Sequence, residues 1–323
     1  MIAIVYHNYL FGNWKTVVTN QLKRLKNSGL YDACDIIWST VNLNGHQENE
    51  YIEHIKEYDK IQIDFQINNN AEYPGIKKVK ELGDTYDDIK VLYFHTKGVS
   101  NDYINWNNKN KSEEKAHNIG LWRECLEYYL IDCWRESLQK LDIFDNVGVT
   151  CNGGWYWGNF WWSQSKHIKK CKEVGHWSRW AYEAWLNEDI IDQTNFEWYK
   201  FTYNPYVSAM DENWYKYPFK YKGSKIILHS ATYGTPDYTI DEGYGDLPLG
   251  IKIDVTKEID KILSAYNYDK INVQASHHAL EVEDPLFGYR KFLFIEFSLD
   301  IEPEKIYKIG AHEGSTIDLN FNL

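Results

Sequence analysis

The sequence lacks most of the features that mark a secreted, disordered or membrane-spanning chain. Proline is scarce, at 7 of 323 residues, and no low-complexity run occurs, which excludes a disordered or fibrous protein. No apolar stretch approaches the roughly 18 residues that a membrane span needs. The five cysteines are scattered and form no Cys-x-x-Cys pair, so neither a zinc knuckle nor a disulfide framework is indicated.

Residues 1–7 lack a basic leader and predict a buried first strand rather than a signal peptide. We therefore expect a cytoplasmic protein, in the host cytoplasm if its source is viral, with no membrane span. Basic residues are also outnumbered, at 35 Lys and Arg against 47 Asp and Glu, giving a formal net charge of -12. Because binding to a phosphate backbone needs clustered basic residues, no nucleic-acid partner is expected.

Aromatic residues are abundant, at 16% of the chain with 14 Trp. Every tryptophan lies between Trp14 and Trp214, so the chain changes character near residue 220. This change predicts two domains, 1–220 and 221–323, joined by a connector at 215–223.

The first domain alternates strand-like and helix-like segments. Strands are expected at Ile2–Tyr6, Asp35–Val41, Ile61–Phe65, Ile89–Phe94 and Asn146–Cys151. Helices are expected from Trp14 to Gly29, and at 48–58, 74–82, 112–141, 165–173 and 178–187. Such alternation predicts a mainly parallel sheet covered by helices on both faces, with ligands beyond the carboxyl ends of the strands. His7 and Asn8 follow the first strand, and His95 follows the fourth.

The segment His95-Thr96-Lys97-Gly98 is the sharpest local signal. Lys97 offers a point charge that could neutralise a diphosphate, and Gly98 permits a tight turn. An ordinary strand-end turn with a solvated lysine explains the residues equally well.

A second signal is the run Gly158-Asn159-Phe160-Trp161-Trp162. Adjacent residues of a strand point to opposite faces, so one indole is expected to pack inward and the other to line a cleft, where its flat ring could stack on a sugar. The alternative is an aromatic core beneath a loop.

Arg179 and Glu183 are four residues apart and share a helix face. On the residues alone, a surface ion pair of little energetic value is the favoured interpretation. The functional alternative makes Glu183 a general base beside the aromatic cleft.

Taken together, these segments resemble a family. The motifs that carry the resemblance are Tyr6-His7, Asn13-Trp14-Lys15, Ser28-Gly29-Leu30-Tyr31, Leu92–Ser100, Trp122-Arg123, Gly158–Trp162, Arg179 and Glu183. In this order, over about residues 1–200, they are similar to a group of bacterial and viral glycosyltransferases often linked to surface polysaccharide synthesis. The resemblance implies an α/β domain of the GT-A-like, Rossmann type that binds a nucleotide sugar.

The implied activity is transfer of a sugar from a UDP- or GDP-sugar donor to a hydroxyl of a glycan acceptor, with inversion at the anomeric carbon. Glu183 is the expected proton acceptor, and Lys97 and Arg179 are expected to stabilise the leaving diphosphate. The residues expected near the donor are His7, Asn8, His95, Thr96, Lys97 and Gly98. Those expected near the acceptor or a sugar ring are Gly158, Asn159, Trp161 and Trp162.

Metal dependence is left open. Most GT-A enzymes carry an Asp-x-Asp after the fourth strand, where the carboxylates hold Mn²⁺ or Mg²⁺ against the diphosphate. Here His95-Thr96-Lys97-Gly98 stands in that place, as in the family it resembles, while Asp87 and Asp88 precede the strand. Lys97 and Arg179 could supply the positive charge instead.

The second domain reads as a small all-β antiparallel sandwich. Its expected strands are Ile226–Gly234, Ile251–Thr256, Ile271–Gln274, Lys291–Phe297 and Thr316–Leu319. It resembles, on few residues, β-sandwich modules appended to some carbohydrate enzymes. Its role is left open between acceptor binding, contact between copies of the chain, and packing. His277 and His278 with Glu281 and Glu283 could ligate a metal, although a solvated loop is favoured.

Two other functions are weighed. A non-catalytic carbohydrate-binding protein would use the Trp-rich cleft to hold glycan, with Glu183 as a structural partner of Arg179. A glycosyltransferase that modifies nucleobases is the other, and the net charge of -12 counts against it.

Overall fold

The computed structural model describes residues 1–68, 70–99, 109–152, 155–175, 179–188, 190, 192–206, 208–209, 212–216, 221–236 and 248–321, without the side chains of 109–114, 152, 179 and 213. The chain forms two compact units. Unit 1 comprises Met1–Asp102 and Arg123–Lys200, and unit 2 comprises Tyr103–Trp122 and Phe201–Leu323. The boundary expected near residue 220 therefore falls within unit 2.

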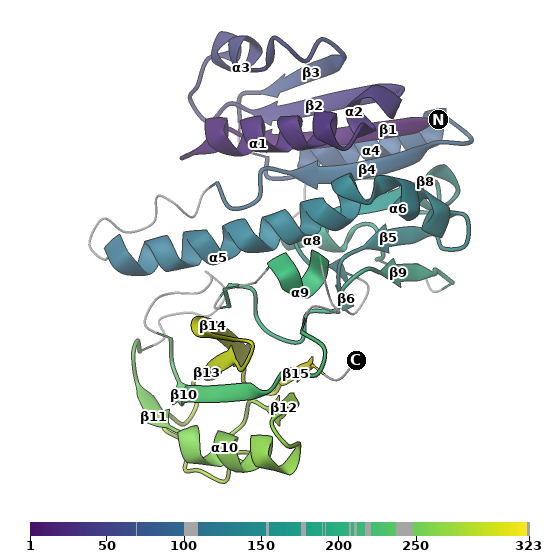
Figure 1. Ribbon diagram of the computed structural model, residues 1–323. Coiled ribbons are helices and arrows are strands. Elements are labelled where there is room, and N and C mark those ends of the chain that lie inside the picture. The colour runs from purple at the N-terminus through teal and green to yellow at the C-terminus, as the bar shows by residue number, and fades with distance from the viewer. Residues whose placement is uncertain are drawn as a thin grey trace. The chain divides into compact units, whose positions relative to one another are not determined.

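Unit 1 is built on a seven-stranded sheet in the order β3-β2-β1-β4-β8-β5-β9 (Figure 1). Its strands are β1 (Ile2–Tyr9), β2 (Ile36–Asn42), β3 (Ile61–Gln66), β4 (Lys90–His95), β5 (Asn146–Gly148), β8 (Trp161–Gln164) and β9 (Asn195–Glu197). Strands β1 to β4 are mutually parallel, and β5 is parallel to β9. The predicted mixed α/β domain with a parallel-rich sheet is confirmed.

Helix α1 (Trp14–Asn27) begins and ends where the sequence predicts. Its buried stripe contains Trp14, Val17, Val18, Leu22 and Leu25, and Gly29 follows it with φ of 76°. That left-handed conformation favours glycine because it has no Cβ. The other helices of this half are α2 (Leu30–Ala33), α3 (Glu48–Ile55) and α4 (Tyr73–Thr85).

Helices α1 and α4 lie on opposite faces of the sheet. Gln21 of α1 contacts Tyr6, whereas Gly75 of α4 lies against His7. Because Tyr6 and His7 are neighbours in β1, their side chains point to opposite faces. The predicted covering of both faces is thus observed (Figure 1).

The single helix expected at 112–141 is interrupted. The structure has α5 (Lys109–Glu127), a π-helical turn over Tyr128–Asp132, and α6 (Trp134–Leu141). The amide of Cys133 bonds to the carbonyl of Tyr128 at 3.0 Å, five residues back, which is the wider π spacing. A helical hydrophobic pattern does not reveal such a bulge.

Strand β8 (Trp161–Gln164) was not among the expected strands, although the two tryptophans were expected to point to opposite faces. It lies inside the sheet and is antiparallel to both β4 and β5. The remaining elements of this stretch are short: β6 (Cys151–Asn152), β7 (Trp155–Tyr156), α7 (Ser165–Ile168) and α8 (Arg179–Ala184). Both helices are shorter than the sequence predicts.

Unit 2 contains a four-stranded antiparallel sheet in the order β11-β10-β13-β14 and a two-stranded sheet of β12 and β15. The strands are β10 (Ile226–Gly234), β11 (Lys252–Asp254), β12 (Lys270–Gln274), β13 (Phe292–Leu299), β14 (Glu302–His312) and β15 (Thr316–Asn320). The expected antiparallel sheet is confirmed, and β14 was missed.

The expectation of an all-β second domain is wrong. Unit 2 contains α9 (Glu212–Lys216), and within the predicted domain 221–323 lies α10 (Thr256–Ala265), with Ile259 and Leu263 buried. These two residues are four apart and lie on one helix face, so burial of that face stabilises the helix.

Candidate functional site

Polar residues converge where β1, β2 and β4 end. His7 lies opposite Thr40 of β2 and opposite His95 of β4 in the parallel register. Beyond β4, the Thr96 amide donates to the His7 carbonyl at 3.1 Å, and the Tyr9 amide donates to Thr96 Oγ1 at 3.0 Å. The structure therefore brings together the predicted residues of the first and fourth strand ends.

His7 and Asn8 are both buried but point to opposite faces of the sheet. His7 Nδ1 is 2.9 Å from Thr40 Oγ1. The Asn8 amide nitrogen donates to Ser39 Oγ at 3.0 Å and to the Tyr6 carbonyl at 3.2 Å. The two residues thus belong to different polar layers, one on each face of the sheet.

On the His7 face, a buried carboxylate organises the strand ends. Glu72 Oε2 accepts hydrogen bonds from the Tyr93 hydroxyl, at 2.9 Å, and from the Asn159 amide nitrogen. Glu72 Oε1 is 3.9 Å from His95 Nε2, which donates to the Gly158 carbonyl at 2.9 Å. We call Glu72, Tyr93, His95 and Asn159 the Glu72 cluster. It joins predicted donor and acceptor residues around a carboxylate that the sequence did not single out.

The electrostatics of this cluster favour an ionised Glu72. Burial acts to raise the pKa of Glu72, but the charges of His95 and His7 and the hydrogen bonds from Tyr93 and Asn159 outweigh it and lower the pKa overall. Burial lowers the pKa of His7 to about 4, so this imidazole is neutral at pH 7. Burial, with the nearby Glu72, holds the pKa of Tyr93 well above its usual value, which keeps its hydroxyl a donor.

The turn after β4 is tight and its lysine is not solvated. The Lys97 amide donates to the His95 carbonyl at 2.8 Å, and Gly98 has φ of 89°, as the expected turn requires. Lys97 is 9% exposed. The alternative of a solvated lysine is therefore wrong.

A second buried carboxylate supports this turn from the α1 face. Gln21 Nε2 donates to the His95 carbonyl at 3.1 Å and to Glu127 Oε1 at 2.7 Å. Arg123 donates to the Lys97 carbonyl at 2.8 Å, and its Nε lies 3.5 Å from Glu127 Oε1. Burial raises the pKa of Glu127 despite the nearby arginines. The carbonyls of His95 and Lys97 thus accept hydrogen bonds from Gln21 and Arg123, and both of these side chains also lie against Glu127.

The expectation that Trp161 or Trp162 lines a cleft is wrong. Their exposed fractions are 1% and 0%, because β8 is an interior strand with both faces covered. Trp161 Nε1 donates to Asn159 Oδ1 at 2.7 Å, and Trp162 Nε1 donates to the Leu130 carbonyl at 2.8 Å. Both rings are core residues, and neither presents a face to a sugar.

Glu183 lies on α8 and is half-buried between Tyr182 and Ala184, which are both buried. Its charge makes the smallest of the contributions that raise the pKa of Tyr93, after burial and Glu72. The side chain of Arg179, its expected partner, lies outside the described part of the chain. The pairing of Arg179 with Glu183 stays a prediction.

Several residues of the site were missed from the sequence. They are Gln21, Thr40, Asn42, Glu72, Tyr93 and Glu127. Thr40 and Asn42 are polar residues at the carboxyl end of a parallel strand. The same criterion selected His7 and Asn8 and would have found them. Glu72 and Glu127 are a loop residue and a helix residue, and no spacing pattern distinguishes them from surface carboxylates.

The residues present do not identify a metal site. Among the described side chains, no group of three or more His, Cys, Asp or Glu is arranged to hold a metal ion, and this includes the segment of His277 and His278. Asp87 precedes β4 and is ion-paired with Lys169 at 2.5 Å, at the opposite end of the strand from the Glu72 cluster. We therefore assign no residue to Mn²⁺ or Mg²⁺.

Comparisons with known proteins add little to this picture. No family model and no curated protein matches the chain. One solved structure that matches is the crystal structure of 4-diphosphocytidyl-2C-methyl-D-erythritol synthase, with 10% sequence identity and a TM-score of 0.30 over 61% of this chain and 87% of that one. None of the helices within the described ranges is long and apolar enough to cross a membrane.

Proposed function

We propose that this protein is a glycosyltransferase that moves a sugar from a nucleotide-sugar donor to a hydroxyl of a glycan acceptor. The observation that carries the proposal is the turn His95–Gly98, hydrogen-bonded to the end of β1 and backed by Gln21 and Arg123. A buried lysine at the carboxyl edge of a parallel sheet suits a diphosphate. The strand order β3-β2-β1-β4 supports the GT-A-like assignment implied by the sequence motifs.

Each residue has a role that follows from the chemistry. Glycosyl transfer leaves positive character on the anomeric carbon and negative charge on the departing diphosphate. Lys97, with Arg179, stabilises that negative charge. Glu183 accepts the proton of the acceptor hydroxyl as the oxygen attacks, a contribution typically worth ~10²–10⁴ in rate. Direct attack from the face opposite the leaving group inverts the anomeric configuration.

The Glu72 cluster holds the segments that carry these groups. Glu72 accepts hydrogen bonds from Tyr93 of β4 and from Asn159, just before β8. His95, at the start of the turn, lies against the same carboxylate. We infer that Glu72 is a positioning residue, since its Oε2 accepts hydrogen bonds from two of these segments and its Oε1 lies 3.9 Å from His95 Nε2.

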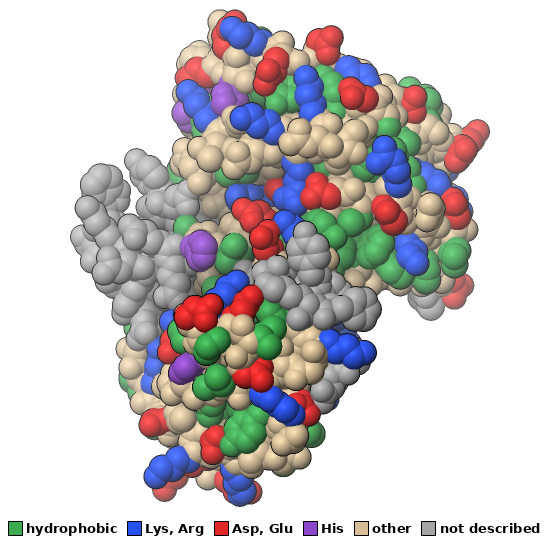
Figure 2. Space-filling view, viewed as in Figure 1, with side chains coloured by type: hydrophobic (Ala, Val, Ile, Leu, Met, Phe, Trp, Pro, Cys, Tyr) green, Lys and Arg blue, Asp and Glu red, His purple; other side chains and the backbone are tan. Residues whose placement is uncertain are grey.

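Two observations weigh against the alternatives. A carbohydrate-binding protein that holds glycan on Trp161 or Trp162 is disfavoured, because both rings are buried. A nucleobase-modifying enzyme would need a basic surface for nucleic acid. On the face drawn in Figure 2, the coloured Lys and Arg side chains are interspersed with Asp and Glu and form no continuous basic stripe.

The test is release of nucleotide from donors. The purified chain is incubated with a panel of UDP- and GDP-sugars, with and without Mn²⁺, and free UDP or GDP is followed over time. We expect slow release from at least one donor, and loss of that release in Lys97→Ala and Glu183→Gln preparations. Absence of release and of any thermal stabilisation by every donor would refute the proposal. Equal release by the variants would indicate a contaminating hydrolase.

A further inference from the structure

The turn after β4 contains a backbone donor without a partner. In the described part of the chain, the amide of Gly98 donates to no group, although the residue is half-buried. The two preceding amides are engaged, Thr96 with the His7 carbonyl at 3.1 Å and Lys97 with the His95 carbonyl at 2.8 Å. Because a backbone N–H that is partly shielded from water usually has a partner, the Gly98 amide is available to a ligand.

The form of the turn decides where this amide points. The Val99 amide donates to the Thr96 carbonyl at 3.5 Å, which closes a four-residue turn with Lys97 and Gly98 at its centre. Of these two central residues only Gly98 has a positive φ, of 89°, which is the pattern of a type II turn. Types I and II differ in the orientation of the central peptide. The same four residues can therefore present the Gly98 amide on either of two sides.

Arg123 of α5 selects one of these orientations. Its Nη1 donates to the Lys97 carbonyl at 2.8 Å. The Lys97 carbonyl and the Gly98 amide belong to one trans peptide, in which the C=O and N–H bonds point in opposite directions. The Gly98 N–H therefore points away from Arg123, and rotation of the peptide would break the bond to the guanidinium.

Glu127 and Gln21 restrain Arg123 and the start of the turn together. Arg123 Nε lies 3.5 Å from Glu127 Oε1, one helical turn along α5. The same oxygen accepts from Gln21 Nε2 at 2.7 Å, and Glu127 Oε2 accepts from Arg24 at 3.2 Å. Gln21 also donates to the His95 carbonyl at 3.1 Å. All of these residues belong to unit 1, and Glu127 is 3% exposed, so the arrangement is held inside one compact body.

A pre-oriented amide on this turn suits an anion. Backbone N–H groups of turns with a left-handed residue form anion-binding concavities, and their bonds to a charged oxygen are stronger than bonds to a neutral one. Lys97 places a positive charge on the same turn. Donors that are already aimed at a developing negative charge stabilise it without reorganising during the reaction.

We propose that the Gly98 amide donates a hydrogen bond to the diphosphate of the donor, and that Arg123 and Glu127 are positioning residues that orient this amide by holding the Lys97 carbonyl. The identity of the anion rests on the proposed function. The orientation of the amide rests on the contacts of Arg123 alone.

A depression between α1 and α5 is the main competing place for an anion. Lys23, Arg24 and Arg123 line it together with Glu124 and Asp132. Arg24 donates to Asp132 at 2.9 and 2.7 Å, so its charge is already balanced. An anion bound there would depend on Lys23, which therefore supplies a control.

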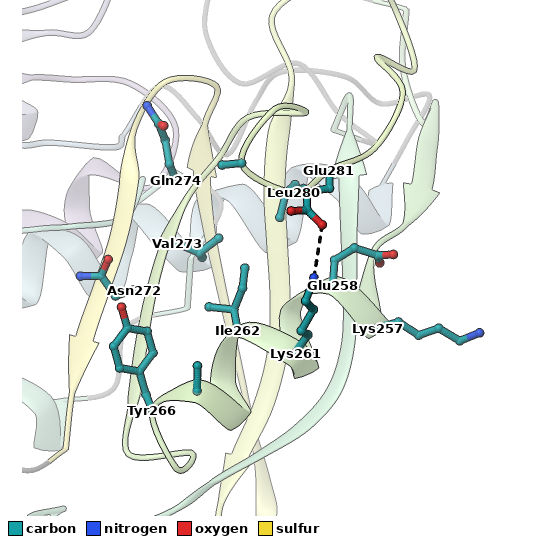
Figure 3. Close-up of a pocket in the computed structure, with 12 residues that line it drawn as sticks. Lys257, Glu258, Lys261, Ile262, Tyr266, Asn272, Val273, Gln274, Leu280 and Glu281 are labelled. Carbon is teal, nitrogen blue, oxygen red and sulfur yellow. Dashed lines mark hydrogen bonds and ion pairs between the residues drawn. The ribbon is translucent and has the colours of Figure 1, made fainter.

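The groove of unit 2 drawn in Figure 3 is a weak competitor. Its charged lining residues are Lys257, Glu258, Lys261 and Glu281, two of each sign, and Lys261 is paired with Glu281 at 3.2 Å. A lining whose charges cancel gives an anion no net attraction. Binding of a diphosphate is therefore expected to report on unit 1.

The first measurement is the affinity of the full chain for UDP and GDP, by isothermal titration calorimetry. Arg123→Lys keeps the charge but cannot hold the carbonyl and lie against Glu127 at once, so binding should weaken roughly fivefold, the loss of about one hydrogen bond. Glu127→Gln should weaken it as well. Because Glu127 acts through Arg123, the double variant should bind no more weakly than Arg123→Lys.

Two controls separate this effect from a general loss of positive charge or of structure. Arg135→Lys alters an arginine that also donates to a carbonyl, that of Ser28 at 3.4 Å, away from the turn. Lys23→Ala removes the exposed cation of the competing depression. Both variants should bind the diphosphate within twofold of wild type.

The second measurement observes the amide itself by nuclear magnetic resonance. Labelling lysine with ¹³C at the carbonyl and glycine with ¹⁵N selects glycines that follow lysine, and the sequence has two, Gly98 and Gly223. Gly223 donates to the Phe321 carbonyl and is the internal reference, and Lys222→Arg removes its signal and so assigns the pair. We expect UDP, GDP or inorganic pyrophosphate to move the Gly98 proton downfield and to leave Gly223 unchanged. The shift should shrink in Arg123→Lys.

A Gly98 proton that does not respond to a bound diphosphate would overturn the proposal, and this result needs only the wild-type chain. Unchanged affinity in a folded Arg123→Lys protein would overturn it too, as would an equal loss in Lys23→Ala, which would place the anion between α1 and α5. Absence of binding by every diphosphate has the same consequence. Binding with the expected shift, but without release of nucleotide from any sugar donor, would refute only the proposed function.

Discussion

Asn159 donates a hydrogen bond to Glu72, which is 87 residues earlier in the chain. The bond joins the segment that leads into β8 to the start of α4, and it fixes a carboxylate that also accepts from Tyr93. Asn159 has φ of 54°, a left-handed conformation in which asparagine is favoured among non-glycine residues. One residue therefore meets a backbone requirement and a side-chain requirement of the site.

These two contributions can be separated by substitution. Asn159→Gly keeps the backbone conformation but removes the donor to Glu72 and the acceptor for Trp161 Nε1. We expect a loss of about 1–3 kcal/mol in the free energy of unfolding, measured in urea, because buried partners are left unsatisfied. Asn44→Gly is the control, since Asn44 is exposed and has φ of 48°. If both variants are equally stable, the Asn159 side chain contributes nothing.

Glu183→Gln tests the assignment of the general base. The substitution is isosteric and removes the ability to accept a proton, so nucleotide release should fall by ~10²–10⁴. The dissociation constant of the donor, measured by thermal shift, should stay within twofold. Glu188→Gln is the matched control in the turn that follows α8, where Glu188 pairs with Lys172, and it should retain activity. Activity of Glu183→Gln within tenfold of wild type would place the base elsewhere.

The sequence predicts those parts of the site that depend on neighbouring residues. It does not predict the parts that depend on contacts between residues distant in the chain. Strand ends such as His7 and His95 are marked by a local change from apolar to polar residues, and the structure brings them together. Strand β8 was missed because a run of aromatic residues buried on both faces has no alternation to detect. Glu72 could not be found, because what distinguishes it is contact with Tyr93 and Asn159, and local sequence carries no record of that contact.

Lys97→Ala is expected to weaken binding of the nucleotide donor. Lys97 belongs to the turn at which the diphosphate is expected, and a charge-assisted contact is worth about 1.5–3 kcal/mol. We therefore expect a rise of roughly ten- to a hundredfold in the dissociation constant for a nucleoside diphosphate. Lys77→Ala, at a 52% exposed side chain of α4, should have no effect. Equal affinities in the two variants would mean that the diphosphate binds away from the turn.

The buried His7 predicts a pH dependence of stability. Burial lowers its pKa from 6.5 to about 4, so between these values the unfolded state binds more protons than the folded state. Stability from this group is fully present above pH 6.5 and is lost as pH falls toward 4, by at most about 3 kcal/mol. Urea midpoints at pH 7 and pH 4.5 should differ more for wild type than for His7→Gln. An identical pH dependence in both would show that His7 does not titrate in this range.

Gly75 of α4 allows the helix to approach the His7 face of the sheet. A Cβ at this position would lie 2.8 Å from Tyr93 Cε2 and 3.0 Å from His7 Cβ, closer than side chains pack. Gly75→Ala should therefore displace Tyr93 from Glu72 and destabilise the protein by about 1–3 kcal/mol, although alanine is the better helix former.

Gly120 of α5 supplies the matched test, because a Cβ there would meet no atom within 4 Å. Gly120→Ala should be neutral or should raise stability by up to about 1 kcal/mol through helix propensity alone. Urea unfolding followed by tryptophan fluorescence compares the two variants, and donor affinity is measured alongside. Because Tyr93 and His7 belong to the site, only Gly75→Ala should also weaken donor binding. A Gly75→Ala protein as stable as Gly120→Ala would show that α4 can move away from the sheet without cost, and the close packing of α4 would then have no role in holding the Glu72 cluster.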